Sequence, residues 1–169
     1  MKLEPRKHEF IQIIDANQGI IKSLCKAYYA SPEDQKDAFQ DIVLQLWKSF
    51  GTFRGDSKVS TWIYRVGLNT ILNKIKNDKR KIITESIGVS ELSLSKAMAD
   101  DDTELLGMVL HCLKDLDKAI VILYLEGYKN KEISHMLDLT PTNVSTRLNR
   151  VREELKTKFK DQHYEFKQP

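Results

Sequence analysis

Near the end of the chain, short polar groups and guanidinium groups recur on one side of a helical pattern. Apolar residues occupy the other side at three- and four-residue intervals, from Val144 to Leu155. Hydroxyl, amide and guanidinium groups on such a face can hydrogen-bond to base edges and phosphates. The pattern therefore predicts recognition of duplex DNA rather than a reaction. The side chains that carry it are Ser145, Thr146, Asn149, Arg150 and Arg152.

The segment before this face must position it. Thr140-Pro141 indicates a helix start, because Thr caps a first turn well and Pro is favoured at the first helical position. A shorter apolar pattern, Ile133–Leu137, precedes it. Asp138-Leu139 lies between the two, where a short polar residue can take the left-handed conformation. We therefore predict a helix-turn-helix over residues 127–155.

Aromatic and basic residues gather in a second segment, Phe53–Lys81. Phe53, Trp62 and Tyr64 supply aromatic surface, and six basic residues and one acid lie between Tyr64 and Lys81. Aromatic side chains beside a basic stripe suit single-stranded nucleic acid, whose bases stack and whose phosphates are neutralised. A solvated helix face with its aromatics in the core explains the same composition equally well. Composition alone leaves both interpretations open.

The charge of the 169-residue chain is unevenly distributed. Residues 1–81 carry 15 basic and 9 acidic groups, residues 82–104 carry 1 and 6, and residues 105–169 carry 11 and 9. Two basic blocks around an acidic segment indicate two modules that face nucleic acid, joined by a segment that avoids phosphates. The sequence has no apolar run of membrane-spanning length and no N-terminal signal region. We expect a cytoplasmic protein without membrane insertion.

Helical periodicity dominates, so we predict an all-α fold of two small helical domains, 1–81 and 105–169, joined by a flexible acidic linker at 82–104. The pattern of Phe10–Tyr29 fits one helix, or two broken near Asn17-Gln18-Gly19. Ser31-Pro32-Glu33-Asp34 starts a helix that runs to about Phe50. A loop with two glycines follows, and a further helix runs from about Ser60 to Lys81.

Residues suited to catalysis or metal binding are scattered. His111-Cys112 lacks a second pair at zinc spacing, and Asp100–Asp102 lacks the glycine and glutamate of a calcium loop. Phosphate loops and nucleophile elbows are absent from the sequence. We therefore expect no metal, no cofactor and no catalytic residue, which makes a small nuclease a remote alternative. Cys25 and Cys112 lie in apolar helical patterns and are expected to be buried, reduced thiols.

Two blocks resemble bacterial sigma factors of the extracytoplasmic-function (ECF) class. DAFQDIVLQLWKSF (37–50) and FRGDSKVSTWIYRVGLNTILN (53–73) are similar to their region two. LHCLKDLDKAIVILYLEGY (110–128), with the helix-turn-helix, is similar to their region four. The resemblance covers about residues 8–160. It implies a transcription initiation factor that binds RNA polymerase core and directs it to specific promoters. The alternative is a helix-turn-helix regulator that binds duplex DNA without acting as a polymerase subunit.

The resemblance also implies partners. The helix at 37–50 would dock on the clamp helices of the largest polymerase subunit, and the flap of the second-largest subunit is a further expected contact. The resemblance implies a further partner, an anti-sigma factor that covers the DNA- and core-binding faces. Gln40-Asp41 matches a polar pair that is usually Gln-Glu. The residues implied in core binding are Asp37, Gln40, Asp41 and Gln45.

The loop at 53–60 and the helix start after it resemble the part of the family that captures a flipped base of the melted −10 promoter element. Flipping costs a few kcal/mol, which pocket contacts and stacking offset. Asn69 matches the position beside that pocket, and Trp62 is expected to be core or a stacking surface. The residues implied in −10 binding are Phe53, Arg54, Arg65, Asn69, Lys74 and Lys76.

The second helix of the helix-turn-helix would lie in the major groove of the −35 element. Ser145 stands where a basic residue is common, and Thr142-Asn143 replaces a common Gly-Thr, so base preferences do not carry over. Lys129 stands where the first helix usually has a capping Ser, and Asn130 is expected to cap instead, with Glu132 supporting the turn. The residues implied in −35 binding are Thr142, Asn143, Ser145, Thr146, Asn149 and Arg150.

Overall fold

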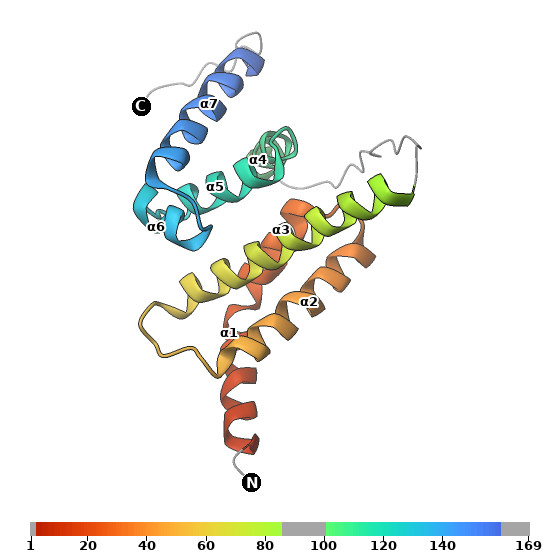
Figure 1. The fold of residues 1–169 in the computed structure, drawn as a ribbon, viewed down its shortest axis with the longest axis vertical. Helices are drawn as coiled ribbons and strands as arrows, with labels where there is room; N and C mark the ends of the chain where they lie inside the picture. The colour runs from red at the N-terminus through yellow and green to blue at the C-terminus, as the bar shows by residue number, and fades with distance from the viewer. Residues whose placement is uncertain (1–2, 86–100, 160–169) are drawn as a thin grey trace. The chain divides into compact units, whose positions relative to one another are not determined.

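The computed structural model describes residues 3–85 and 101–159, and the secondary structure in these ranges is entirely α-helical (Figure 1). The chain divides into two compact units, Met1–Gly107 and Met108–Pro169. Each unit buries its own set of apolar side chains. The predicted all-α fold class is confirmed.

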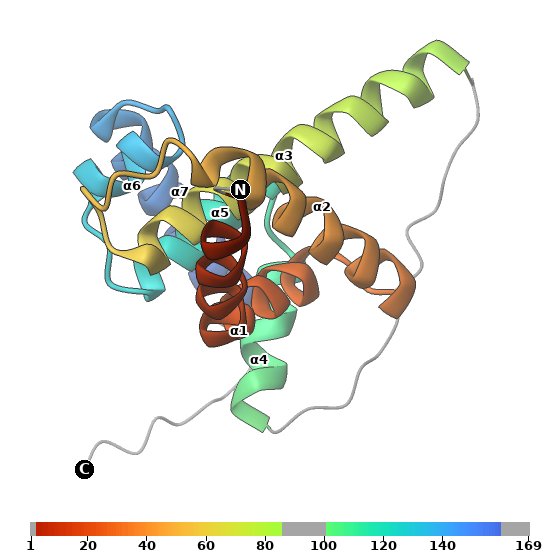
Figure 2. The same cartoon turned by 90° about the horizontal axis from the view of Figure 1, so that it is seen from below.

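Three helices build the first unit: α1 (Leu3–Tyr28), α2 (Pro32–Phe50) and α3 (Val59–Glu85). Each packs against the other two. α2 and α3 run antiparallel and side by side, and α1 crosses them (Figures 1 and 2). Their shared core consists of fully buried aliphatic side chains from all three helices. These are Ile21, Leu24, Ile42, Leu46, Ile63, Leu68 and Ile71.

The helix α1 is continuous, so the alternative of a break near Asn17-Gln18-Gly19 is wrong. The Asn17 side-chain amide donates to the Ile13 carbonyl at 2.8 Å, within the helix. Ile14 and Ile21 are both buried, one on either side of the weak helix formers. Residues seven apart share a helix face, so packing of that face holds the helix together through Gly19.

The close approach of the three helices requires a small residue on α3. A Cβ atom added to Gly67 would lie 2.9 Å from Leu24 Cδ1 of α1 and 3.7 Å from Ile42 Cγ2 of α2. At the start of α2, the Ser31 hydroxyl accepts a hydrogen bond from the Asp34 N–H at 3.0 Å, as its capping role predicts.

The second unit contains the predicted helix-turn-helix. α5 (Asp115–Leu125), α6 (Asn130–Met136) and α7 (Pro141–Phe159) pack against one another around a buried core. Thr140 caps α7 by accepting the Asn143 N–H at 3.1 Å, and Asp138 takes the left-handed conformation with φ of 53°. Both local predictions are confirmed. The core includes Ile120, Leu123, Ile133, Val144 and Val151.

The cap of α6 differs from the sequence-based expectation. Lys129 is the N-cap residue, and the Glu132 carboxylate accepts its backbone N–H at 2.7 Å. Asn130 lies inside the helix, and its side-chain amide donates to Ser145 Oγ of α7 at 2.8 Å. The expectation that Asn130 caps the helix is therefore wrong, because its side chain is engaged across the helix-turn-helix.

Helical structure reaches into both ends of the expected linker at 82–104. α3 continues to Glu85, and α4 (Asp101–His111) begins before residue 105. The rest of the expected linker, 86–100, lies outside the described residues, and Asp100 is part of it. The C-terminal residues from 160 lie outside them as well. None of the helices in the described ranges is both long and apolar enough to cross a membrane.

Candidate nucleic-acid interfaces

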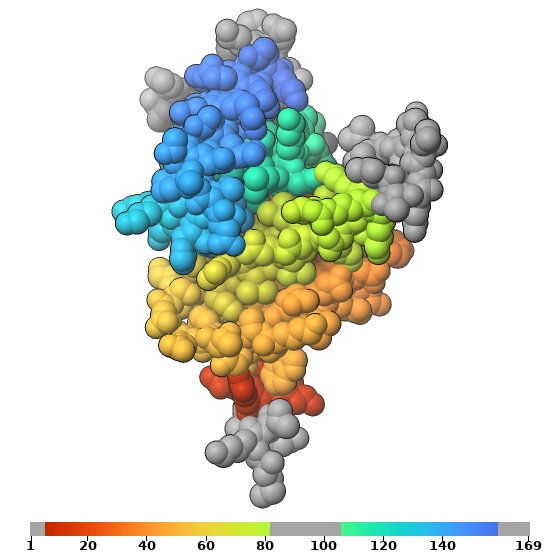
Figure 3. All heavy atoms as spheres, viewed as in Figure 1, coloured from red at the N-terminus to blue at the C-terminus, as the bar shows by residue number. Residues whose placement is uncertain are grey.

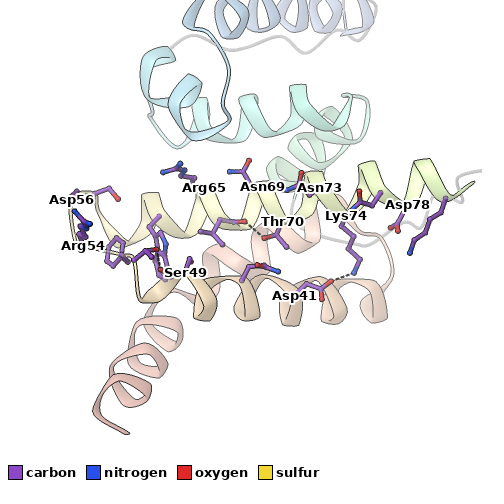
Figure 4. A pocket seen from close by; sticks show the side chains of 18 residues that line it. Asp41, Ser49, Arg54, Asp56, Arg65, Asn69, Thr70, Asn73, Lys74 and Asp78 are labelled. Atoms are coloured by element: carbon purple, nitrogen blue, oxygen red, sulfur yellow. Dashed lines mark hydrogen bonds and ion pairs between the residues drawn. The ribbon is translucent and has the colours of Figure 1, made fainter. Parts of the chain in front are cut away.

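A groove of about 940 Å³ runs along α3 in the first unit (Figure 4). Figure 3 shows the face on which α2, in orange, and α3, in yellow to green, lie next to each other. The groove is formed by α3, the loop after α2 and the facing part of α2. It brings together five of the six residues predicted to bind the −10 element. Its lining includes Asp41, Gln45, Phe53, Arg54, Asp56, Trp62, Arg65, Asn69, Asn73, Lys74, Asn77 and Lys81.

Aromatic side chains close one end of this groove. Phe53 stacks on Trp62 with ring centroids 4.8 Å apart and an interplanar angle of 26°. Trp62 is only 8% exposed and also contacts Phe50 of the core, at 6.2 Å between centroids. Trp62 is therefore a core residue, while the half-buried Phe53 carries the aromatic surface to the groove. The core interpretation holds for Trp62, whereas the binding of nucleic acid by Phe53 stays a prediction.

A column of polar side chains follows the groove along α3. Arg65, Asn69, Asn73, Asn77 and Lys81 recur every four residues, so each lies beside the next in a row that winds slowly around the helix, and all five line the groove. Figure 4 shows the first three side chains standing on the same side of α3. Amides can both donate to and accept from base edges. Sequence reasoning counted Lys81 among the basic residues of this segment but missed Asn73 and Asn77, although their four-residue spacing could have revealed them.

An ion pair connects the two walls of the groove. The Lys74 ammonium donates to the Asp41 carboxylate at 2.6 Å, and this hydrogen bond raises the pKa of Lys74 above its ordinary value. Lys74 therefore carries its charge at neutral pH. A residue predicted to bind DNA is paired with a residue predicted to bind polymerase. Lys76, the sixth residue predicted to bind the −10 element, does not line the groove.

A second, apolar groove of about 770 Å³ lies between α1 and α2. Its lining includes two large apolar side chains that are well exposed, Ile11 at 44% and Leu44 at 48%. Gln40 lines this apolar groove, whereas Asp41 and Gln45 line the polar one and Asp37 lines neither. The structure thus separates the four residues predicted to bind core. The lining consists of Lys7, Phe10, Ile11, Phe39, Gln40, Val43, Leu44 and Trp47.

The outer face of α7 carries the residues predicted to bind the −35 element. Val144 and Val151 are buried against the other helices of the unit, and the polar positions fall on the opposite side. Ser145 is half-buried and accepts the hydrogen bond from Asn130. The other five are exposed, and four of them help to line a shallow groove of about 400 Å³. That groove consists of Thr140, Thr142, Asn143, Thr146, Arg147 and Arg150.

One aspartate and two arginines connect α5 to the outer face of α7. Asp117 of α5 has a buried side chain, and its two oxygens accept hydrogen bonds from Arg147 and Arg150, each at 2.8 Å. Sequence reasoning missed both Asp117 and Arg147. The signal was an acid in the first turn of an apolar helix together with two arginines three residues apart on a later helix.

The cysteines divide between the interior and the surface. Cys25 is buried in the first unit, and burial raises its pKa to about 11. Cys112 follows the end of α4 and is exposed, so its expected burial is wrong. Within the described residues, no group of three or more His, Cys, Asp or Glu side chains could hold a metal ion.

Comparisons with known proteins show the family of this chain. Residues 13–81 match the family model Sigma-70 region 2, and residues 103–155 match Sigma-70, region 4. The chain is 28% identical to the ECF RNA polymerase sigma-E factor of Haemophilus influenzae, over 90% of this chain and 88% of the relative. It is 26% identical to the ECF RNA polymerase sigma factor SigW of Bacillus subtilis, over 90% and 89%.

The fold is also similar to that of a solved sigma factor. The Bartonella quintana sigma factor RpoE, crystallised in complex with the anti-sigma factor NepR, superposes with a TM-score of 0.72. The match covers 92% of this chain and 97% of that chain, at 18% sequence identity.

The two family matches, in this order, define a sigma factor of the sigma-70 family. The chain belongs to the ECF class, whose members it matches over most of both lengths. It is a transcription initiation factor that binds RNA polymerase core and directs it to specific promoters. The region-two match argues against a helix-turn-helix regulator that is not a polymerase subunit.

Proposed function

We propose that the groove along α3 holds the melted −10 strand, that α7 reads the −35 duplex, and that the apolar groove between α1 and α2 docks on polymerase core. The observation that carries this proposal is the α3 groove itself. It combines a stacked aromatic pair, a column of amides and several cations within one unit. This combination suits a single strand, whose bases stack and whose phosphates need neutralising.

Each part of the groove has a distinct role in this proposal. Phe53 offers a stacking surface at the loop end, where a flipped base would enter. Asn69 and Asn73 offer amides to base edges farther along α3, and Arg65 and Arg54 neutralise phosphates. Unstacking a base costs a few kcal/mol, which these contacts offset. Lys81 extends the cationic track beyond the amides, and Lys76, which does not line the groove, would meet phosphates outside it.

The apolar groove supports a protein contact. Exposed apolar side chains that cluster beside polar groups mark protein interaction sites. We place the contact with the clamp helices of the largest polymerase subunit here, with Leu44 as the central apolar contact and Gln40 at its edge. Asp37, and Asp41 and Gln45 on the side of α2 that lines the polar groove, would add polar contacts with core outside the apolar groove. In the second unit, the exposed Tyr124 and Leu125 at the end of α5 provide an apolar surface for the flap of the second-largest subunit.

Regulation by a protein partner is part of the proposal. The Bartonella quintana relative in the fold comparison was solved with an anti-sigma factor. A partner of that kind would silence this chain by covering the apolar groove and the outer face of α7. The chain itself would act in the cytoplasm, where core polymerase meets the chromosome. All chemistry would belong to the polymerase.

Separate variants of the two grooves test the assignment. Leu44→Asp should lower affinity for purified core polymerase by tenfold or more, because it places a charge at a desolvated contact. Asn69→Ala should keep core affinity within about twofold but reduce opening of the −10 region roughly tenfold. Gln12→Ala, on an exposed part of α1, is the control. The promoter would come from mapping transcript starts after overexpression, and strand opening would be followed by permanganate reactivity.

The two variants make the proposal refutable. Equal loss of core binding and opening in Asn69→Ala would remove Asn69 from the strand-binding role. Unchanged core affinity in Leu44→Asp would remove the apolar groove from the polymerase interface.

A further inference from the structure

The outer face of α7 is braced from behind by an acid on another helix. Asp117 lies in the first turn of α5, and its side chain is only 5% exposed. Its Oδ1 accepts a hydrogen bond from Arg147 Nη1, and its Oδ2 accepts one from Arg150 Nη2. One carboxylate therefore fixes two guanidinium groups that lie one turn apart on α7.

The network continues along α7. Arg147 Nε donates to the Asn143 side-chain oxygen at 2.8 Å, so the carboxylate is connected to the first turn of the helix. Asn143, Arg147 and Arg150 all line the shallow groove on this face. The brace thus reaches the surface that the proposed function assigns to DNA.

Two arginines and two acids set the charge of this cluster. Arg147, Arg150 and the buried Asp117 together carry a net charge of about +1, so Asp117 does not by itself cancel attraction for phosphates. The exposed Glu154, whose Oε1 lies 3.8 Å from Arg150 Nε, is a second and more distant acidic partner of Arg150. Without the carboxylate, two like charges one turn apart would repel each other. A guanidinium has five N–H donors, and the contact with Asp117 engages one donor of Arg150. The Arg150 side chain is 47% exposed, so its remaining edge can reach a base.

Fixing the arginines in advance matters because a long side chain loses rotamer freedom when it binds. A free arginine loses about 2 kcal/mol of rotamer entropy when it is ordered. Preorganised groups avoid much of this cost at the moment of binding. A bidentate contact between arginine and guanine also depends on the guanidinium plane, which a carboxylate behind it can set.

We propose that Asp117 is a positioning residue for promoter recognition, which fixes Arg147 and Arg150 so that α7 presents one preset guanidinium edge to the −35 duplex. This inference rests on the proposed role of α7. It gives Asp117 a role in sequence discrimination, with guanine as the preferred base opposite Arg150. Arg147 is the more covered of the two arginines, at 28% side-chain exposure, and serves as the brace.

The test uses the full chain bound to core polymerase and a duplex library with a randomised −35 region. Bound DNA is sequenced for the wild type, for Asp117→Asn, Arg150→Ala and Glu126→Gln, and for the double variant that combines Asp117→Asn with Arg150→Ala. Glu126→Gln removes the same charge from the exposed far end of α5 and is the matched control. Enrichment of the preferred bases measures discrimination, and the retained fraction of scrambled duplex measures non-specific affinity.

In Asp117→Asn we expect enrichment at the Arg150 position to fall on the order of tenfold, the scale of one good base contact. Retention of scrambled duplex should stay the same or rise, because a negative charge is removed. In the Arg150→Ala background, Asp117→Asn should have little further effect at that position. Glu126→Gln should keep the wild-type motif.

Three results would count against the proposal in different ways. An unchanged motif in Asp117→Asn would overturn it. Equal loss of binding to the preferred and to the scrambled duplex, with a lower melting temperature, would mean that the contact of Asp117 with the two arginines only stabilises the fold. If Arg150→Ala kept the wild-type motif, the proposed role of α7 would fail before that of Asp117. Should Asp117→Asn not fold, Asp117→Glu keeps the charge but moves the guanidinium groups, and it should alter the motif.

Discussion

At the scale of single residues, the important ion pairs join different helices. Lys74 of α3 meets Asp41 of α2, and Asp117 of α5 meets two arginines of α7. Ion pairs between helices at a surface contribute little to the free energy of folding. Their role here is to orient side chains at a binding surface. Their sequence separations of about thirty residues explain why sequence analysis did not predict the pairs. It identified Lys74, Asp41 and Arg150 singly and missed Asp117 and Arg147.

The Asp41–Lys74 pair predicts how charge in the α3 groove controls affinity for single strands. Asp41→Asn should raise the affinity for a labelled thymidine oligonucleotide about two- to fivefold at low salt, because the groove loses a negative charge. The gain should shrink as salt rises. Fluorescence anisotropy measures it, and Glu9→Gln, a charge change on exposed α1, is the control. The same gain in both variants would mean that only net charge matters.

Burial of a thiol predicts a dependence of stability on pH. Burial raises the pKa of Cys25 from 9.0 to about 11, so the thiol ionises in the unfolded chain before it ionises in the folded one. Its contribution is fully present below pH 9 and is lost as the pH rises toward 11. Burial also raises the pKa of Tyr29, which acts in the same direction.

Urea unfolding below pH 9 and near pH 11 checks this contribution. The free energy of unfolding should fall over this range in the wild type, and it should fall less in Cys25→Ala. The comparison uses the change with pH rather than the absolute value, because the smaller side chain also alters packing. Equal changes in both proteins would show that Cys25 is not the responsible group.

At the scale of helices, local signals predicted the ends better than the interiors. Ser31 and Thr140 cap their helices as expected, because a side chain three residues before a free N–H decides that geometry. The continuity of α1 depends on the burial of Ile14 and Ile21 by other helices, which a local pattern does not contain. Asn130 likewise departs from its expected role because of a partner on α7.

Two glycines in helices should respond oppositely to the same substitution. Gly19 has no atom within 4 Å of an added Cβ, so Gly19→Ala should stabilise the protein by about 0.5–1 kcal/mol. Gly67→Ala should destabilise it by about 1–3 kcal/mol, because the methyl group would press on buried Leu24 and Ile42. Denaturant unfolding measures both. Destabilisation by Gly19→Ala would contradict the continuous, exposed helix described at that position.

At the scale of the whole molecule, the sequence predicted the class and the order of the two units. Helical periodicity and the two blocks that resemble sigma factors were sufficient for this prediction, because each unit folds around its own core. The α3 groove was predicted only in part. Its amide column depends on a helix face, and the separation of Gln40 from Asp41 depends on which side of α2 is covered by α1. Residue types alone did not distinguish these two sides.

We propose that two units of one chain read two elements of one promoter while the same chain holds polymerase core. The most direct measurement is transcription by purified core and this chain from three templates, which carry both elements, only the −10 element or only the −35 element. We expect transcripts from a defined start on the first template and at least tenfold fewer on the other two. Equal transcription from all three templates, or none from the first despite a stable complex with core, would contradict it.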